Sequence, residues 1–181
     1  MQRDYVFSGH LKSEDIKELR SLLNMTQQEL AGFLCVSKRT VERWETTDEV
    51  ITGAIVPLAE MLLRKPELEE TLRLEKNKLK LRIKYMYKSI LCTVIDVDEL
   101  KRKVIIKNYI DNPMMRAFGK NTEPSFEDYE EFLESRCFPR TRDKMKIELK
   151  RLGIPFYDPI MIIEKTEGRM AEDDFWLILE R

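Results

Sequence analysis

Two capped helical segments stand close together in residues 24–45, and this pairing constrains the fold more than any other feature of the chain. Thr26 is a favourable N-cap residue, and Glu29 stands three positions later, as in a capping box. Ser37 suits the N-cap of a second segment. Because few residues separate the first segment from Ser37, we expect two short helices joined by a tight turn.

The apolar residues of this stretch recur at helical spacing within each expected helix. They are Leu30, Ala31 and Leu34 in the first segment and Val36, Val41 and Trp44 in and around the second. The small side chain of Ala31 allows the second helix to cross closely over the first. Together these features predict a helix-turn-helix, in which the second helix enters the major groove of DNA.

The segment from about Ser13 to Leu68 resembles the XRE/Cro-type helix-turn-helix of phage repressors and many antitoxins. The resemblance covers the first third of the chain and rests on Leu19-Arg20, residues 26–31, Val36-Ser37, and residues 41–45. Downstream, a further set of residues resembles the last helix of antitoxins of the HigA and MqsA kind. These residues are Thr52-Gly53-Ala54, Leu58, Leu62-Leu63 and residues 66–68. The chain departs from the family at two usual glycine positions, which hold Cys35 and Thr46.

The resemblance implies a set of DNA-binding residues, which here are Gln27, Gln28, Ser37, Lys38, Arg39, Thr40 and Arg43. In relatives the glutamine at the position of Gln27 clamps a DNA phosphate at a helix N-terminus. The first residues of the second helix reach base edges, and these are Lys38, Arg39 and Thr40. Arg43 lies one turn further along, suited to a base or a phosphate. The alternative is a small helical bundle whose basic side chains are simply solvated.

Two further expectations follow from the resemblance. Arg20 and Glu45 occupy the positions of a salt bridge that ties the first helix to the end of the second helix of the motif. At the turn, a left-handed backbone at Cys35 would cost about 1 kcal/mol more than the same backbone at glycine.

Charge is segregated along the chain, although the net charge is only −1. Basic residues dominate residues 73–107, whereas acidic residues gather in residues 123–134. An acidic patch on a DNA-binding protein suits a basic protein partner or a second copy of the chain. The alternative is a solvated helix face.

The remaining composition argues against several classes of function. The three cysteines, Cys35, Cys92 and Cys137, form no C-x-x-C pair, and His10 is the only histidine, so we expect no metal site and no cofactor. We find no nucleophile–base pair or paired acids at catalytic spacing, which predicts that the chain is not an enzyme. With no long apolar run or signal-peptide core, we expect no membrane association and a cytoplasmic location, in a bacterium or phage.

The fold class that we expect is mainly α, with an N-terminal XRE-type helix-turn-helix bundle and a small α+β C-terminal domain. Residues 1–68 would form the DNA-binding domain, residues 69–88 a linker helix, and residues 89–181 a partner-binding or dimerisation domain. In the first domain we expect a helix capped by Ser13 and a last helix over 52–64.

The second domain shows a different pattern. Residues 90–97 and 103–109 are rich in β-branched residues and predict a hairpin. Helices are expected after Ser125, over residues 141–152 up to Gly153, and from Asp158-Pro159 to near Gly168. Residues 175–179 would add a final strand to the hairpin.

Residues 136–142 and 168–176 resemble a stretch near the start of HipA-like kinases. The resemblance implies an accessory module that docks onto such a protein. Possible partner-binding residues are Glu127, Glu130, Glu131, Arg136, Arg142 and Trp176. The alternative is that the arginines and the tryptophan are structural residues of a small domain.

The function that we expect is a DNA-binding transcriptional regulator that binds a double-stranded operator as a homodimer. It would act as the antitoxin and autorepressor of a toxin–antitoxin pair, with a kinase-like or other toxin as its protein partner. Two alternatives stay open: a phage- or mobile-element repressor without a toxin, and an adaptor that binds and inhibits a kinase-like protein.

Overall fold

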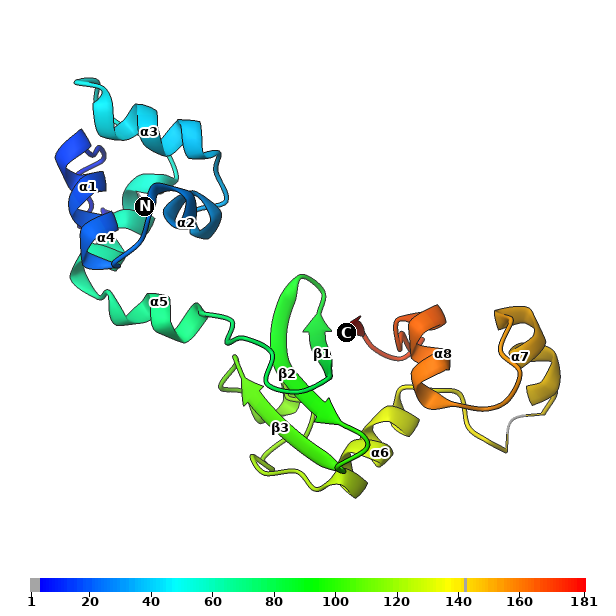
Figure 1. The fold of residues 1–181 in the computed structure, drawn as a ribbon. Coiled ribbons are helices and arrows are strands. Elements are labelled where there is room, and N and C mark those ends of the chain that lie inside the picture. Colours follow the sequence, from blue (N-terminus) through cyan, green and yellow to red (C-terminus); the bar gives the residue numbers. More distant parts are fainter. Residues whose placement is uncertain (1–3, 142) are drawn as a thin grey trace. The chain divides into compact units, whose positions relative to one another are not determined.

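The chain folds as two units, residues 1–74 and residues 75–181, each with its own hydrophobic core. The computed structural model describes residues 4–141 and 143–181, and Figure 1 labels its helices and strands. The expected fold class is confirmed: helices of a helix-turn-helix precede a small antiparallel sheet with helices. No helix in the described part of the chain is long and apolar enough to cross a membrane.

In the described residues of the N-terminal unit, from residue 4 onward, the regular structure is helical apart from one isolated β-bridge. Its helices are α1 (Ser13–Leu22), α2 (Gln27–Phe33), α3 (Lys38–Thr46), α4 (Ile55–Arg64) and α5 (Glu67–Leu72). Helix α3 packs against α1 and α2, and α1 packs against α4. The residues at the centre of this core are fully buried: Ile16, Leu19, Leu30, Ala31, Val41 and Ala59. The apolar spacing seen in the sequence therefore corresponds to the faces that the helices bury.

Helix ends follow the expected caps with two differences. Thr26 caps α2 and Ser37 caps α3, as expected. Ser13, in contrast, is the first residue of α1 and not its cap. The Asp15 carboxylate accepts a hydrogen bond from the Lys12 N–H instead, at 2.6 Å. Helix α4 begins three residues later than expected, after the positive φ of 100° at Gly53.

The C-terminal unit is organised around a four-stranded antiparallel sheet of order β3-β2-β1-β4. The strands are β1 (Leu81–Tyr87), β2 (Ile90–Asp98), β3 (Lys103–Asn108) and β4 (Phe175–Glu180). The expected hairpin is present as β2 and β3. The expected last strand is present too, but it pairs with β1, where Ile83 stands opposite Leu179.

Helices pack against this sheet and complete the second core. They are the 3₁₀ turn η1 (Pro113–Met115) and the helices α6 (Phe126–Ser135), α7 (Met145–Leu152) and α8 (Pro159–Thr166). Ser125 caps α6, Gly153 in a left-handed conformation ends α7, and Asp158 caps α8, all as expected. Helix α7 begins at Met145, four residues later than expected, after the left-handed Lys144. Buried side chains of α6 and α8 join those of β1, β2 and β4 in one cluster.

The prediction of a linker helix over residues 69–88 is wrong. Helix α5 ends at Leu72, residues 73–80 are irregular, and β1 follows. Leu79, Ile83 and Met86 fit a helical stripe, but pairing with β2 on one side and β4 on the other outweighs this local pattern. The boundary between the units consequently falls after Leu74 and not after residue 68.

Candidate nucleic-acid interface

The turn between α2 and α3 depends on one residue with a left-handed backbone. Cys35 has a φ of 55°, and its N–H donates to the Gly32 carbonyl at 3.2 Å. The Val36 N–H donates to the Ala31 carbonyl at 2.9 Å. These two bonds form the Schellman motif, which usually has glycine at the position of Cys35. The departure from the family pattern therefore falls on the residue whose conformation favours glycine.

Helix α3 is oriented by what it buries. Val41 is completely buried and Glu45 is 5% exposed, so the opposite side of the helix faces solvent. At its start the Ser37 hydroxyl accepts a hydrogen bond from the Thr40 N–H at 3.1 Å and lies 2.8 Å from the Thr40 hydroxyl. The cap fixes the first turn of the helix, where base-reading side chains of a helix-turn-helix stand.

The exposed side of α3 gathers most of the predicted DNA-binding residues. A shallow depression there is lined by Ser37, Arg39, Thr40, Glu42, Arg43 and Thr46. Arg39 and Arg43 are exposed, and within residues 4–141 and 143–181 no carboxylate forms an ion pair with either. Two unpaired guanidinium groups one helical turn apart therefore face solvent.

Lys38 differs from these two arginines. Its Nζ lies 2.9 Å from the Glu42 carboxylate, in a pair whose side chains are both about half exposed. Such an exposed pair stabilises a helix by only about 0.3–0.5 kcal/mol, so Lys38 can leave it at little cost. Sequence reasoning missed Glu42, although the spacing of four residues between Lys38 and Glu42 is a visible signal for this contact.

Behind the exposed face, a buried carboxylate joins three helices. Arg20 Nε donates to Glu45 at 2.6 Å, so the expected ion pair between α1 and the end of α3 is present. Gln27 Nε2 donates to the other oxygen of Glu45 at 2.7 Å. Burial raises the pKa of Glu45, but hydrogen bonds from Arg20 and Gln27 outweigh burial and hold this pKa below its ordinary value.

The contact with Glu45 gives Gln27 a structural role that the sequence did not reveal. An amide NH₂ group has two donors, and the bond to Glu45 uses one of them. A second donor at the N-terminus of α2 stays compatible with the predicted phosphate contact. Gln28 beside it is exposed.

The C-terminal unit corrects the expectation that Arg136 faces a partner. Arg136 is buried, and its guanidinium donates to both oxygens of Asp173, at 2.6 and 3.0 Å, and to the carbonyls of Gly168 and Phe175. Trp176 donates from Nε1 to the Lys88 carbonyl at 2.7 Å. Arg136 therefore holds the segment before β4 in place, and Trp176 ties β4 to the turn between β1 and β2, so each has a structural role.

The other predicted partner residues divide into three groups. Glu127 and Glu130 both contact the Arg102 guanidinium, at 2.6 and 3.4 Å. Glu131 is exposed on α6. Arg142 lies outside the described residues.

Comparison with known proteins identifies the N-terminal unit. Residues 16–53 match the family model described as helix-turn-helix, a match that runs from within α1 to the loop before α4. No curated protein and no solved structure gave a match to this chain. The matched stretch contains both helices of the motif, the Cys35 turn and the Glu45 contacts. Residues 16–53 are therefore a helix-turn-helix domain, which suggests a DNA-binding regulator.

Proposed function

We propose that this chain is a sequence-specific transcriptional repressor that places α3 in the major groove of a double-stranded operator. The observation that carries the proposal is the pair of exposed, unpaired arginines on the solvent face of a capped α3, Arg39 and Arg43. Arginine can bind guanine O6 and N7 with two hydrogen bonds, which is the commonest specific base contact. The family match to residues 16–53 supports the same assignment.

Different residues would supply different parts of the binding free energy. Arg39 and Thr40, in the first turn of α3, would contact base edges, and Arg43 would contact a base or a phosphate. Gln27 and Gln28 would contact phosphates at the N-terminus of α2. Phosphate contacts carry no sequence information, so the glutamines would contribute affinity and the first turn of α3 would contribute specificity.

We further infer a homodimer that binds a palindromic operator, because a single helix reads only a half-site. The C-terminal unit would hold either the second copy or a protein partner. Its acidic helix α6 supports a protein target, since its carboxylates would repel a phosphate backbone. The role that best combines these parts is the antitoxin and autorepressor of a toxin–antitoxin pair in a bacterial cytoplasm. In this role the chain binds but does not catalyse.

The same arrangement suits a phage- or mobile-element repressor without a toxin. An adjacent open reading frame that is toxic when expressed alone, and harmless when co-expressed with this chain, would support the antitoxin. An adaptor for a kinase-like protein is a weaker candidate, because the residues behind that resemblance include the buried Arg136.

The test begins with selection of operator duplexes from a random pool, followed by fluorescence anisotropy on the selected duplex. Arg39→Ala is expected to weaken specific binding by about 1–3 kcal/mol and to relax the preference at one base position. Lys65→Ala is the matched control, because it also removes one exposed positive charge but lies at the end of α4. Equal affinities of Arg39→Ala, Arg43→Ala and the wild-type protein would refute the assignment of α3.

A further inference from the structure

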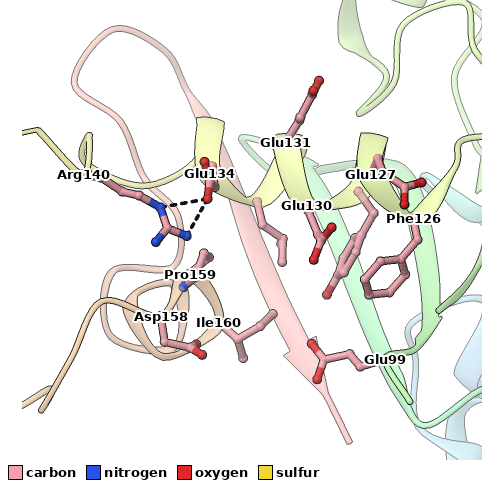
Figure 2. A pocket seen from close by; sticks show the side chains of 12 residues that line it. Glu99, Phe126, Glu127, Glu130, Glu131, Glu134, Arg140, Asp158, Pro159 and Ile160 are labelled. Atoms are coloured by element: carbon pink, nitrogen blue, oxygen red, sulfur yellow. Dashed lines mark hydrogen bonds and ion pairs between the residues drawn. The ribbon is translucent and has the colours of Figure 1, made fainter. Parts of the chain in front are cut away.

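A groove in the C-terminal unit combines negative charge with apolar walls. It lies between α6, the start of α8 and the turn after β2 (Figure 2). Its acidic residues are Glu99, Glu127, Glu130, Glu131, Glu134 and Asp158, and its apolar lining includes Phe126, Leu133 and Ile160. In Figure 2, Glu130 points from α6 into the groove, whereas Glu131 on the same helix points away from it.

One wall of this groove has an unsatisfied polar atom. Tyr129 is 1% exposed and lines the groove, yet its hydroxyl has no hydrogen-bond partner within the described part of the chain. A buried hydroxyl without a partner costs about 1–3 kcal/mol, so such atoms are rare without a reason. Burial raises the pKa of Tyr129 most, the charges of Glu99, Asp158 and Glu130 raise it further, and a side-chain interaction with Glu99 that is too long to satisfy the hydroxyl adds least. Tyr129 and two of these acids, Glu99 and Asp158, line the same groove.

Arginines of the chain itself neutralise the two ends of the groove. At one end the Arg102 guanidinium contacts Glu127 and Glu130 and lies 4.3 Å from the centre of the Phe126 ring. At the other end Arg140 binds Glu134 at 2.7 Å. Each end therefore shows how this groove receives a guanidinium: a carboxylate holds the head group, and at Phe126 an aromatic face covers it.

The middle of the groove also has carboxylates, but no arginine of the described residues binds them. Glu99 forms no ion pair among residues 4–141 and 143–181, and neither does Asp158, which accepts only the Met161 N–H at 2.9 Å. Tyr129, whose pKa both carboxylates raise, lines the groove with them. Two uncompensated acids and an unsatisfied hydroxyl thus share one site.

We propose that the middle of this groove binds the guanidinium of a single arginine side chain from a basic segment of a partner protein. The Tyr129 hydroxyl would accept one N–H, while Glu99 and Asp158 would accept the others. Leu133 and Ile160 would cover the aliphatic stem, as apolar surface does for long cationic side chains. The site is independent of the proposed operator binding, which uses the N-terminal unit.

The chemistry of the groove selects this ligand over other cations. A free amino acid would bring an α-carboxylate into a groove that is already lined by six acidic residues. Among the described residues, no three or more side chains of the metal-binding types are arranged to hold an ion. A lysine ammonium is a compact charge, whereas the planar guanidinium can bind acceptors on two sides of the groove at once.

The experiment titrates the ¹⁵N-labelled full chain with the tripeptide N-acetyl-Gly-Arg-Gly amide and follows backbone amide shifts. Saturable shifts are expected at α6, at the turn after β2 and at the start of α8, with a Kd near or below about 1 mM. The matched peptide with citrulline in place of arginine has the same shape without the charge and is expected not to bind. The peptide with lysine in place of arginine tests whether any positive charge suffices for binding. Free arginine tests whether the groove binds a small molecule.

Two variants and one control locate the site. Glu99→Gln is expected to weaken binding of the arginine peptide about fivefold. Glu123→Gln removes the same charge from an exposed residue just before α6 that does not line the groove, and it is expected to leave binding unchanged. Tyr129→Phe is expected to weaken binding about fivefold as well, while the melting temperature of the free protein stays equal or rises, because an unsatisfied hydroxyl is removed.

Several outcomes would overturn the proposal. They are equal binding of the citrulline peptide, equal losses in Glu99→Gln and Glu123→Gln, and no saturable shift up to about 10 mM, ten times a millimolar Kd. Tighter binding of free arginine than of the peptide would assign the groove to a small molecule instead. A melting temperature that falls in Tyr129→Phe would show that its hydroxyl already has a partner.

Discussion

The two units stabilise their folds with arginine–carboxylate pairs of the same chemistry in different surroundings. In the N-terminal unit, Arg20 is 30% exposed while its partner Glu45 is buried. In the C-terminal unit, Arg82 and Asp96 are 5% and 6% exposed and bind through two contacts, at 2.7 and 2.8 Å. The first pair reaches water at one end, whereas the second is enclosed on both sides.

Because of this difference, the two units depend to different degrees on a single ion pair. Glu45 has Gln27 as a second donor, so loss of Arg20 leaves the carboxylate partly satisfied. Arg82 donates to Asp96 and to the Glu75 carbonyl, so loss of Asp96 leaves a buried cation without the carboxylate that it binds. The units can be followed separately because the two tryptophans, Trp44 and Trp176, lie in different units.

The largest effect is expected for Asp96→Ala. It should lower the free energy of unfolding of the C-terminal unit by about 3–5 kcal/mol, because it strands the buried guanidinium of Arg82. Urea denaturation of the Trp44→Phe chain, in which Trp176 reports on this unit, measures the change. The double variant Arg82→Met/Asp96→Leu should recover much of the loss, since no charge then stays buried. If Asp96→Ala lowers the free energy of unfolding by no more than Arg20→Met does, the enclosed pair is no more critical to its unit than the half-exposed pair, and the comparison fails.

A smaller loss is expected for Arg20→Met in the N-terminal unit. We expect about 1–3 kcal/mol, since Glu45 keeps its hydrogen bond from Gln27 and the vacated edge admits water. Trp44 fluorescence in the Trp176→Phe chain measures this unfolding. Arg64→Met is the control, because the pair of Arg64 with Glu60 is more exposed and should contribute less than about 1 kcal/mol.

The pH dependence sharpens the same comparison at Glu45. Its pKa in the folded protein lies below the ordinary value of 4.5, so its contribution to stability is complete above about pH 4.5. The contribution should be lost as the pH falls below 4.5 through the folded pKa. Unfolding curves of the N-terminal unit from pH 6 to pH 3, with and without Glu45→Gln, measure the difference. Parallel pH profiles of the two proteins would show that Glu45 is not the titrating group.

The smallest effect is expected at the turn of the helix-turn-helix. Cys35→Gly should stabilise the N-terminal unit by up to about 1 kcal/mol, because glycine adopts the φ of 55° without a steric penalty. Cys35→Ala is the matched control, since it keeps a Cβ and should change stability little. Destabilisation by glycine would mean that its greater freedom in the unfolded chain outweighs the relief of strain.

The comparison also explains which parts of the molecule the sequence predicts. The caps at Thr26, Ser37, Ser125 and Asp158 are all found where the sequence places them. Caps depend on residues within three positions, so they can be read locally. Strand β1 could not be read this way, because its conformation depends on pairing with β2 next to it and with β4 about ninety positions further along the chain.

The two candidate sites also differ in whether neighbouring or distant residues form them. The exposed face of α3 follows from the buried positions of Val41 and Glu45 at helical spacing. The groove between α6, the start of α8 and the turn after β2 has no such signal in the sequence, because Glu99, Tyr129 and Asp158 come from three separate elements. Arg136 illustrates the reverse error: a sequence motif that resembles a docking segment places its arginine inside the domain.

The sequence by itself determined the helix-turn-helix, its caps, its buried faces and the identity of the side chains on α3. Each of these follows from spacings of three or four residues along one helix. Only the tertiary structure decided the order of the strands, the boundary after Leu74, and the environments of Arg82, Arg136 and Tyr129. Long-range pairing and burial depend on residues far apart in the chain, so no local pattern encodes them.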